Sequence, residues 1–324
     1  MPELACPQQC SFCDQQKISG KSKYPDLQEI KATIDKYLTS FTENDREVEI
    51  AFFGGTFTGL PLSKQQEYLS VAHEYLKKGE IHGIRLSTRP DYIDEENLHL
   101  LKKLGVTTIE LGAQSLDDEV LRSCNRGHTV AQVETASEMI NRFDFTLGLQ
   151  MMIGLPGDTY QKSIATTHKI IDLGAKETRI YPCLVIKGTQ LAEEFHRGLY
   201  EPLTMDEAVK LSAELTLLFE TANVKVIRLG LHRSEDLQQG SMLAGPYHIS
   251  FKELVMTEVW SRMLANELEN IDSNNFQLFV APKQLNFAVG YGMKNKKMLL
   301  ERFPKVNISV DNSLINREYR IISR

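Results

Sequence analysis

The stretch Met1-Pro-Glu-Leu-Ala-Cys6-Pro-Gln-Gln-Cys10-Ser-Phe-Cys13-Asp14 holds three of the five cysteines of the chain. Their spacing is C-x3-C-x2-C, and an aromatic residue, Phe12, stands directly before the last sulfur. Three thiolates are too few for a closed tetrahedral zinc site, which needs four nitrogen or sulfur ligands, or for a ferredoxin cluster, which takes four cysteines. A 4Fe-4S cluster on three thiolates keeps one iron open, and an open coordination site is typical of a reactive metal centre. We therefore predict a metal centre on Cys6, Cys10 and Cys13 that binds a further ligand.

The cysteine spacing alone leaves two other interpretations open. A distant histidine could close a structural zinc site as its fourth ligand, or the thiols could bind nothing. The rest of the chain favours the cluster.

Length and composition bound the class of protein. A chain of 324 residues, 42% of them hydrophobic, is long enough for one large α/β domain with a small appended module. No apolar run approaches the roughly 18 residues of a membrane span, and no secretory pattern stands before Cys6. Clustered cysteines fit reduced thiols better than a disulfide framework, so we expect a cytoplasmic protein that contacts no membrane. The net charge of -6 argues against broad nucleic-acid binding but leaves a local basic patch open.

Short apolar runs alternate along the chain with amphipathic stretches of helical period. The runs are 48–53, 84–87, 106–112, 145–153, 178–185 and 224–229, and the helical stretches are 27–41, 63–78, 94–104, 130–142, 160–173 and 205–222. This alternation predicts right-handed βαβ units and a parallel sheet. We predict an α/β fold with a full or partial (β/α) barrel, in which the loops after the carboxyl ends of the strands carry the chemistry.

The cysteine loop, with Phe12 before Cys13, resembles the cluster loop of the radical S-adenosylmethionine (radical SAM) superfamily. The resemblance implies a partial (β/α) barrel, a 4Fe-4S cluster whose open iron binds S-adenosyl-L-methionine, and reductive cleavage of that molecule to a 5′-deoxyadenosyl radical. It also implies a low-potential electron donor such as flavodoxin or ferredoxin. In that superfamily a strand precedes the cysteines, and five residues are too few for a strand and its connection. Either the native chain starts upstream of Met1 or the barrel lacks its first strand. We favour a shortened start, which would leave the cluster loop anchored on one side only.

Two strand-end segments resemble SAM-binding motifs of this superfamily. Gly54-Gly55-Thr56-Phe57 is similar to the segment that holds the methionyl amino group, and its glycines permit close approach of a ligand. In Ser87-Thr88-Arg89-Pro90-Asp91, Pro90 keeps the residue before it extended. That segment resembles the radical SAM module of the Elongator catalytic subunit and its bacterial relatives. Many related enzymes carry Glu at the place of Ser87, which leaves its contact with SAM open.

Two later segments complete the implied binding site. Gln114 and Arg126 lie twelve residues apart, as do a glutamine and an arginine that contact SAM in the resembling enzymes. A guanidinium also pairs well with a carboxylate. The run 148–158, which ends in Gly-Leu-Pro-Gly, resembles the adenine-binding strand. The SAM contacts implied by the resemblance are Phe12, Gly54, Gly55, Thr56, Phe57, Ser87, Thr88, Arg89, Gln114, Ser115, Arg126, Gln150, Met152, Gly154 and Leu155.

The catalytic residues are not identified by any motif. Tyr181 and Cys183 are weak candidates to face the substrate, because a buried cysteine is usually a small hydrophobic residue. Cys124 is interpreted as structural. His232 and His248 could bind substrate or line the floor of the barrel, and the sequence does not rank these roles.

The chain from about residue 250 onward is predicted to be a separate α/β piece. It has helical stretches at 251–268 and 296–303 and strand-like runs at 276–280, 306–310 and 319–322. The predicted domains are a barrel at 1–232 and, by resemblance, a carboxy-terminal radical SAM module at 233–324, with no acetyltransferase segment after it. The loop 290–297, rich in Gly and Lys, could contact phosphates, although a solvated turn before a basic helix is favoured.

The leading functional prediction is a radical SAM enzyme that abstracts hydrogen from an unidentified substrate. Resemblance to the Elongator-like group suggests transfer RNA, whereas the acidic net charge favours a small molecule. The alternative from another class is an iron–sulfur or zinc-binding electron-transfer or binding protein that does not turn over SAM.

Overall fold

The computed structural model describes residues 8–14, 25–41, 46–232, 240–268, 271 and 275–323, so Cys6 lies outside the described residues. The chain divides into two compact units. The larger unit comprises Met1–Leu203 and Phe219–Pro246, and the smaller unit comprises Thr204–Leu218 and Tyr247–Arg324. The predicted domain boundary between 232 and 233 stays a prediction.

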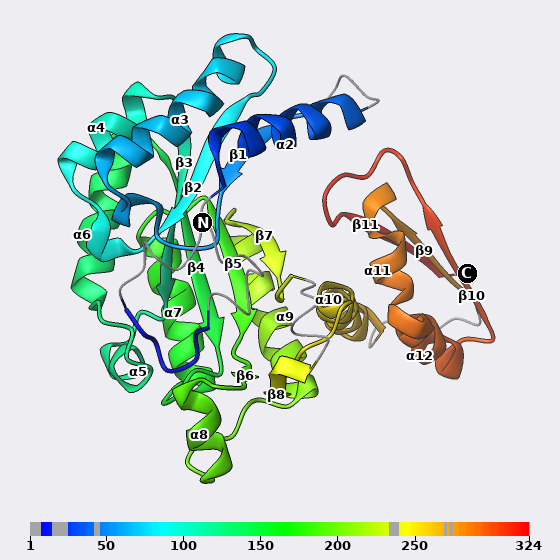
Figure 1. Cartoon of the computed structure of the whole chain (residues 1–324). Helices are drawn as coiled ribbons and strands as arrows, with labels where there is room; N and C mark the ends of the chain where they lie inside the picture. The colour runs from blue at the N-terminus through cyan, green and yellow to red at the C-terminus, as the bar shows by residue number, and fades with distance from the viewer. Residues whose placement is uncertain are drawn as a thin grey trace. The chain divides into compact units, whose positions relative to one another are not determined.

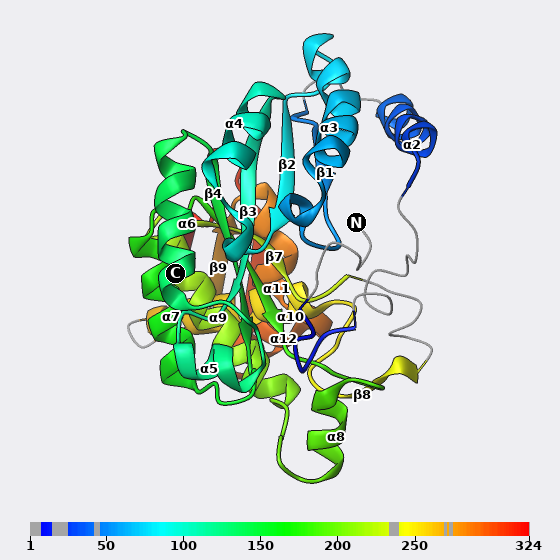
Figure 2. The same ribbon diagram turned by 60° about the vertical axis from the view of Figure 1, so that its left-hand side comes forward.

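The larger unit is built on a six-stranded parallel sheet in the order β1-β2-β3-β4-β5-β7. The strands are β1 (Glu49–Phe52), β2 (Gly83–Thr88), β3 (Val106–Gln114), β4 (Thr146–Ile153), β5 (Glu177–Pro182) and β7 (Lys225–Leu229). Its helices are α2 (Leu27–Ser40), α3 (Leu62–Lys77), α4 (Glu95–Lys103), α5 (Asp118–Ser123), α6 (Val130–Arg142), α7 (Tyr160–Asp172) and α8 (Gln190–His196), whereas most of α9 (Met205–Thr221) belongs to the smaller unit. Figures 1 and 2 show α4, α6 and α7 together on one face of the sheet. Parallel strands joined by helices form an open (β/α) barrel, as the alternating pattern predicts.

Local sequence signals explain where the helices begin. Thr129 caps α6, because its side chain accepts a hydrogen bond from the Gln132 amide while the Gln132 side chain accepts one from the Thr129 amide. Asp26 and Glu29 form the same reciprocal box at the start of α2. Such boxes satisfy amide donors that have no partner inside the helix, so the predicted starts lie within one or two residues of the observed ones.

The apolar run 178–185 is two strands rather than the predicted one. β5 ends at Pro182, which has no amide hydrogen to donate to a strand ladder. After this break, β6 (Val185–Ile186) pairs antiparallel with β8 (Met242–Ala244) in a separate two-stranded sheet. The break turns the chain at the carboxyl end of β5.

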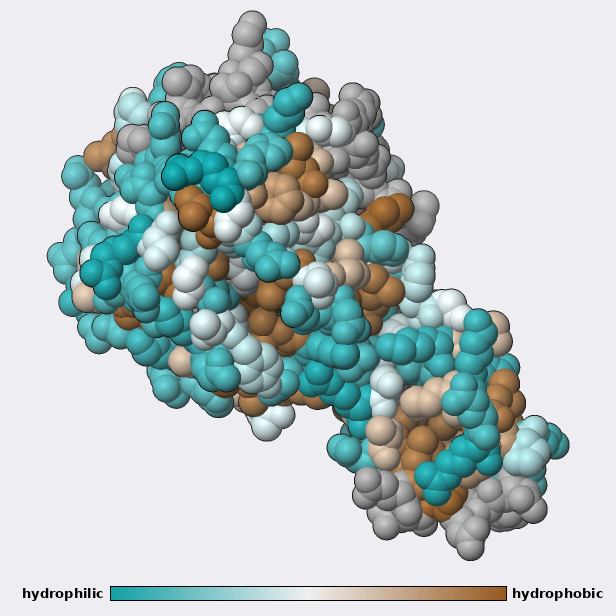
Figure 3. Space-filling model, turned by 90° about the horizontal axis from the view of Figure 1, so that it is seen from below, coloured by the Kyte–Doolittle hydropathy of each residue, from teal (hydrophilic) through white to brown (hydrophobic). Residues whose placement is uncertain are grey.

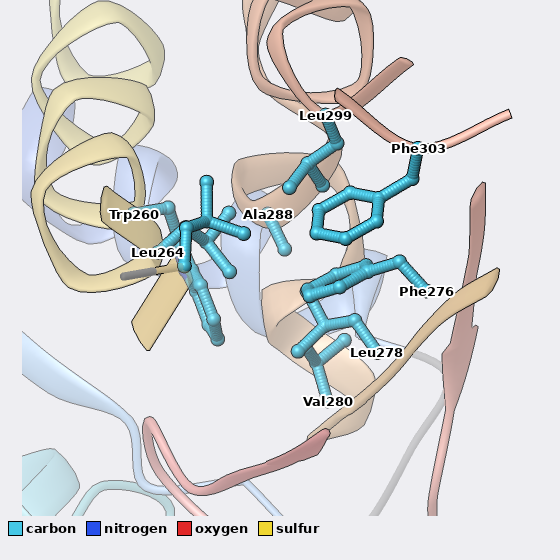
Figure 4. Packing of buried hydrophobic residues seen from close by; sticks show 9 residues of the cluster. Trp260, Leu264, Phe276, Leu278, Val280, Ala288, Leu299 and Phe303 are labelled. Carbon is cyan, nitrogen blue, oxygen red and sulfur yellow. The ribbon is translucent and has the colours of Figure 1, made fainter. Parts of the chain in front are cut away.

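The smaller unit packs helices against one three-stranded sheet. Its elements after α9 are α10 (Phe251–Leu268), β9 (Asn275–Val280), α11 (Leu285–Val289), α12 (Lys294–Arg302), β10 (Lys305–Val310) and β11 (Tyr319–Ser323). β9 lies in the middle, parallel to β10 and antiparallel to β11. The core is apolar, with the Phe276 and Phe303 rings stacked at a centroid distance of 5.0 Å (Figure 4). The Trp260 indole donates a hydrogen bond to Gln284 Oε1 at 3.0 Å.

The surface is largely polar. In Figure 3, brown apolar residues stand among teal polar ones on the visible face of the molecule. None of the helices in the described ranges has the length and apolarity that a membrane crossing needs.

Candidate active site

A cavity in the larger unit gathers most of the side chains that the sequence singles out. Of the predicted residues, its wall contains Phe12, Cys13, Gly54, Gly55, Thr56, Ser87, Thr88, Arg89, Gln114, Arg126, Gln150, Met152, Tyr181 and His232. These residues come from the cysteine loop, from β2, β3, β4 and β5 or the segments next to them, from the segments after β1 and β7, and from the turn after α5. The carboxyl ends of parallel strands meet at one edge of a barrel, which explains why positions far apart in sequence converge there.

The two described cysteines of the loop lie at this cavity. Cys13 is half-buried in the cavity wall, and Cys10 is buried behind it. Arg126 Nη1 donates a hydrogen bond to Cys10 Sγ at 3.4 Å, and Arg126 Nη2 donates one to the Gly112 carbonyl at 2.8 Å. Because Cys6 lies outside the described residues, the predicted trio cannot be measured. Over the described ranges, no group of three His, Cys, Asp or Glu side chains could hold a metal ion.

The cysteine loop is held by two separate elements, while the expectation of a missing strand before the loop concerns residues 1–7, which lie outside the described residues. The Ser11 amide donates to the Cys124 carbonyl at 3.0 Å, and Asn125 Nδ2 donates to the Gln9 carbonyl at 2.9 Å. On another side, the Leu191 amide in α8 donates to the Ser11 carbonyl at 2.8 Å. The turn after α5 and the start of α8 thus both hold the loop.

Gln114 and Arg126 present buried polar atoms that have no partner among the described residues. These atoms are Gln114 Oε1 and Arg126 Nε. Gln114 also has φ of 66°, a left-handed conformation that is costly for a residue other than glycine, at a register shift between β3 and β4. Unsatisfied buried atoms and strained backbone are both rare and gather at ligand sites.

The chemistry of this pair fits the amino-acid end of SAM. Gln114 Oε1 accepts hydrogen bonds and matches an ammonium group, whereas Arg126 Nε donates and matches a carboxylate. Both side chains line the same cavity as Cys13 of the cysteine loop, and Arg126 also donates to Cys10 Sγ. The residues present therefore suit a 4Fe-4S cluster with SAM.

A buried carboxylate that the sequence reasoning missed organises the interior of the barrel. Glu110 is 1% exposed and accepts hydrogen bonds from Arg179 Nε, from Arg85 Nη1 at 3.0 Å and from Gln150 Nε2 at 3.0 Å. Burial alone would lower the pKa of the Arg179 guanidinium, but Glu110 raises it above its ordinary value. The sequence did carry a signal for this buried pair, namely charged residues inside otherwise apolar strand runs. Such residues are buried only when they are paired.

Glu110 orients two residues of the cavity wall. Gln150 donates a second hydrogen bond to Ser87 Oγ at 3.2 Å, and the Arg179 guanidinium lies over the Phe53 ring at 4.7 Å. Gln150 and Arg179 therefore have little rotational freedom.

A second missed residue is His128, which is buried behind the strained turn. Its Nε2 lies 3.2 Å from the Ala113 carbonyl, so the neutral tautomer with a proton on Nε2 donates there. Burial, and then the charges of Arg126 and Arg89, lower the pKa of His128 to about 3. His128 is therefore uncharged at neutral pH and supports the backbone next to Gln114.

Some predicted residues lie outside the cavity wall. Phe57 is fully buried with its ring 5.1 Å from that of Phe52, and Ser115 is buried near Thr166. The Gly154 amide donates to Asp158 Oδ2 at 2.9 Å, and Leu155 packs with Cys10. These residues pack behind the strand ends and support the cavity wall.

The weak catalytic candidates differ in access. Tyr181 lines the cavity, and burial raises the pKa of its hydroxyl. Cys183 is 2% exposed, and burial raises the pKa of its thiol to about 12. Cys124 is buried with Cys10, and His248 belongs to the smaller unit, where its ring meets Tyr291 edge-on.

Comparison with known proteins agrees with this geometry. Residues 4–170 match the radical SAM superfamily, and residues 175–261 match the radical SAM C-terminal domain. The chain is 31% identical over 185 residues to a tRNA uridine(34) acetyltransferase of Methanocaldococcus jannaschii, covering 51% of this chain and 34% of that protein. It is 27% identical over 233 residues to Elongator complex protein 3 of Homo sapiens, covering 66% and 42%. The matched part of the chain thus spans about a third of the length of the acetyltransferase.

Solved structures show the same fold. The Elp3 protein of Methanocaldococcus infernus with an N-terminal deletion superposes with a TM-score of 0.62 at 24% identity, covering 74% of this chain and 59% of that one. Methylornithine synthase superposes with a TM-score of 0.50 at 15% identity, covering 72% and 73%. These likenesses support the predicted partial barrel of radical SAM type with a small carboxy-terminal sheet. Together with the match over residues 4–170, they show that the chain belongs to the radical SAM superfamily and is related to the Elp3-type tRNA-modifying enzymes.

Proposed function

We propose that this chain reductively cleaves SAM and uses the resulting radical to take a hydrogen atom from a substrate in the cavity. The observation that carries the proposal is the pair of unpartnered buried atoms, Gln114 Oε1 and Arg126 Nε, beside Cys10 and Cys13. Cys6, Cys10 and Cys13 would hold a 4Fe-4S cluster. When bound and reduced, the cluster supplies the electron that breaks the sulfonium bond of SAM to give a 5′-deoxyadenosyl radical.

The residues of the chain would bind, orient and shield. Arg126 donates to Cys10 Sγ and keeps Nε for a carboxylate, so one guanidinium would place the cluster thiolate and SAM relative to each other. The glycines at 54 and 55 leave room for the methionyl amine beside Thr56. Phe12, Phe53 and Met152 supply apolar wall that would keep water from the reacting atoms.

The substrate class proposed is RNA, by likeness to the tRNA-modifying relatives. Residues 247–324 carry eleven Lys and Arg against eight Asp and Glu, although the whole chain has a net charge of -6. Affinity for RNA that rests on phosphate contacts falls as salt rises. If transfer RNA binds with no salt dependence between low and moderate ionic strength, a small-molecule substrate replaces RNA in this proposal.

The test is turnover of SAM after anaerobic reconstitution with iron and sulfide. With dithionite as the electron source, the protein should release 5′-deoxyadenosine, and a Cys10→Ala variant should release none above background. A physiological donor of the flavodoxin or ferredoxin type is expected to replace dithionite. A preparation that binds zinc and no iron, with no 5′-deoxyadenosine, would instead indicate the binding protein without turnover.

A further inference from the structure

Two arginines lie side by side on neighbouring strands at the carboxyl end of the sheet. Arg179 of β5 and Arg228 of β7 are register partners in the parallel pairing of these strands. Residues paired in this way project to the same face of a sheet. Arg179 lines the cavity, and Arg228 lies next to it on the same face of the sheet, at the border of the cavity wall.

The two arginines differ in how their charge is balanced. Arg179 Nε and Nη2 both donate to the Glu110 carboxylate. Arg228, which is half-buried, donates from Nε to the Gly230 carbonyl at 3.2 Å, and no carboxylate of the described ranges pairs with it. Partial burial, and then repulsion from Arg179, lower the pKa of its guanidinium, although nearby Tyr181 opposes this shift. Burying a cation in part without a counter-charge costs free energy. The fold does not need this cost to form.

The groups around Arg228 suit an anion. Arg228 lies close enough to interact electrostatically with Tyr181 and with the exposed His232, both of which line the cavity. A guanidinium, a phenol hydroxyl and an imidazole all donate hydrogen bonds to oxygen. Such a set matches the oxygens of a phosphate or carboxylate, and the Arg179 charge is already neutralised by Glu110.

We propose that Arg228, together with Tyr181 and His232, binds an oxyanion of the substrate at the β5–β7 side of the cavity. The role of this subsite in substrate binding rests on the proposed function. In that function the substrate is RNA, and the oxyanion is the phosphate of a nucleotide. A carboxylate of a small-molecule substrate has the same chemistry. The subsite lies on strands other than β3, which carries Gln114, so it leaves the amino-acid end of SAM to Gln114 and Arg126.

The stability of two matched variants separates a ligand site from a structural one. Arg228→Gln removes an unbalanced charge, and its thermal midpoint should equal or exceed that of the wild type. Arg179→Gln leaves Glu110 without its main partner, and its midpoint should fall by several degrees. A large loss of stability in Arg228→Gln would overturn the proposal, because it would show that the arginine is balanced within the fold.

The binding test uses the reconstituted full chain under anaerobic conditions with saturating SAM, which occupies its own site. Calorimetric titration with uridine 5′-monophosphate should give tighter binding than titration with uridine. In Arg228→Gln the affinity for the monophosphate should fall about tenfold or more and approach that for uridine. Lys225→Gln, which removes an exposed charge from the same strand, should bind as the wild type does.

Competition by simple anions identifies the source of the oxyanion. Displacement of the monophosphate by inorganic phosphate supports a nucleotide, and displacement by acetate supports a carboxylate substrate. If neither anion competes, or if Arg228→Gln binds the monophosphate as the wild type does, the subsite does not exist. None of these measurements needs turnover, so their failure is distinct from failure of 5′-deoxyadenosine release.

Discussion

The wall of the cavity contains polar side chains whose buried atoms lack a hydrogen-bond partner among the described residues or whose backbone is strained. Gln114 combines a left-handed backbone with an unpartnered amide oxygen, and Arg126 has an unpartnered Nε close by. A fold selected only for stability would avoid both features. Their cost is consistent with a role in binding.

Replacing Gln114 with glycine tests that interpretation. Glycine removes the left-handed strain and the unsatisfied oxygen, at a loss of about 0.5–1 kcal/mol from greater freedom of the unfolded chain. The free energy of unfolding should therefore change by less than about 1 kcal/mol. Affinity for SAM, measured by equilibrium dialysis, should fall about tenfold or more because the amine loses its acceptor.

A matched control for Gln114→Gly is Gln132→Gly on the surface of α6. There glycine should destabilise the helix and leave SAM affinity unchanged, since Gln132 serves only the cap. Equal SAM affinity in the Gln114→Gly variant and the wild type would contradict a role for Gln114 in binding.

The low pKa of His128 predicts acid sensitivity of the fold. His128 titrates near 3 in the folded protein and at the ordinary value of 6.5 when unfolded, so the unfolded state binds more protons between these values. The contribution of uncharged His128 to the free energy of unfolding is fully present above pH 6.5. It is lost as pH falls toward 3, at up to about 1.4 kcal/mol per pH unit.

The measurement compares urea unfolding of cluster-free wild type and His128→Asn at neutral pH and near pH 4.5. The difference in unfolding free energy between the two proteins should shrink by about 2–3 kcal/mol on acidification. A pH-independent difference for His128→Asn would show that folding does not lower the pKa of His128.

At the level of elements, the turn between α5 and α6 holds the cysteine loop, a role that the sequence did not suggest. Residues 124–126 of this turn hold the cysteine loop through the Cys124 carbonyl, the Asn125 amide and the Arg126 guanidinium. Its geometry depends on Asn125, which has φ of 50°, a left-handed value that asparagine tolerates. The chain thus anchors its cluster loop from elements far along the sequence.

The Asn125→Ala variant should lose part of this anchorage. Removing the bond to the Gln9 carbonyl frees the loop, so iron retained after reconstitution and desalting should fall well below the roughly four atoms of a full cluster. Exchange of the Ser11 amide hydrogen should also become faster in the cluster-free protein.

The control is Asn141→Ala, which removes an equivalent bond to the Leu173 carbonyl at 3.0 Å. It should keep the iron content and the Ser11 exchange rate of the wild type. Equal iron in the two variants would show that the Asn125 side chain is not needed to place the loop.

On the scale of the whole molecule, the two units have separate cores. The core of the smaller unit contains Trp260, the one tryptophan of the chain, together with Phe276 and Phe303. Tryptophan fluorescence therefore reports on that unit.

The Phe276→Ala variant should destabilise the smaller unit by about 3–5 kcal/mol, because it opens a cavity in a close-packed core. The fluorescence transition in urea should move to lower concentration, while the cluster absorbance of the larger unit keeps its midpoint. Leu300→Ala, at an exposed position of α12, is the control and should leave both transitions unchanged. Coincident shifts of both signals would show that the units unfold together.

The sequence by itself determined the alternating strands and helices, the cysteine loop and most of the residues that meet in the cavity. Those features are local, because periodicity, caps and motif spacing act over a few residues. The tertiary structure alone decided the pairing of Glu110 with Arg179, the neutral state of buried His128, the anchorage of the cysteine loop by two distant elements and the lack of a carboxylate partner for Arg228 among the described residues. Each of these depends on which distant side chains share a buried volume, and pairing and desolvation in that volume cannot be read from spacing along the chain.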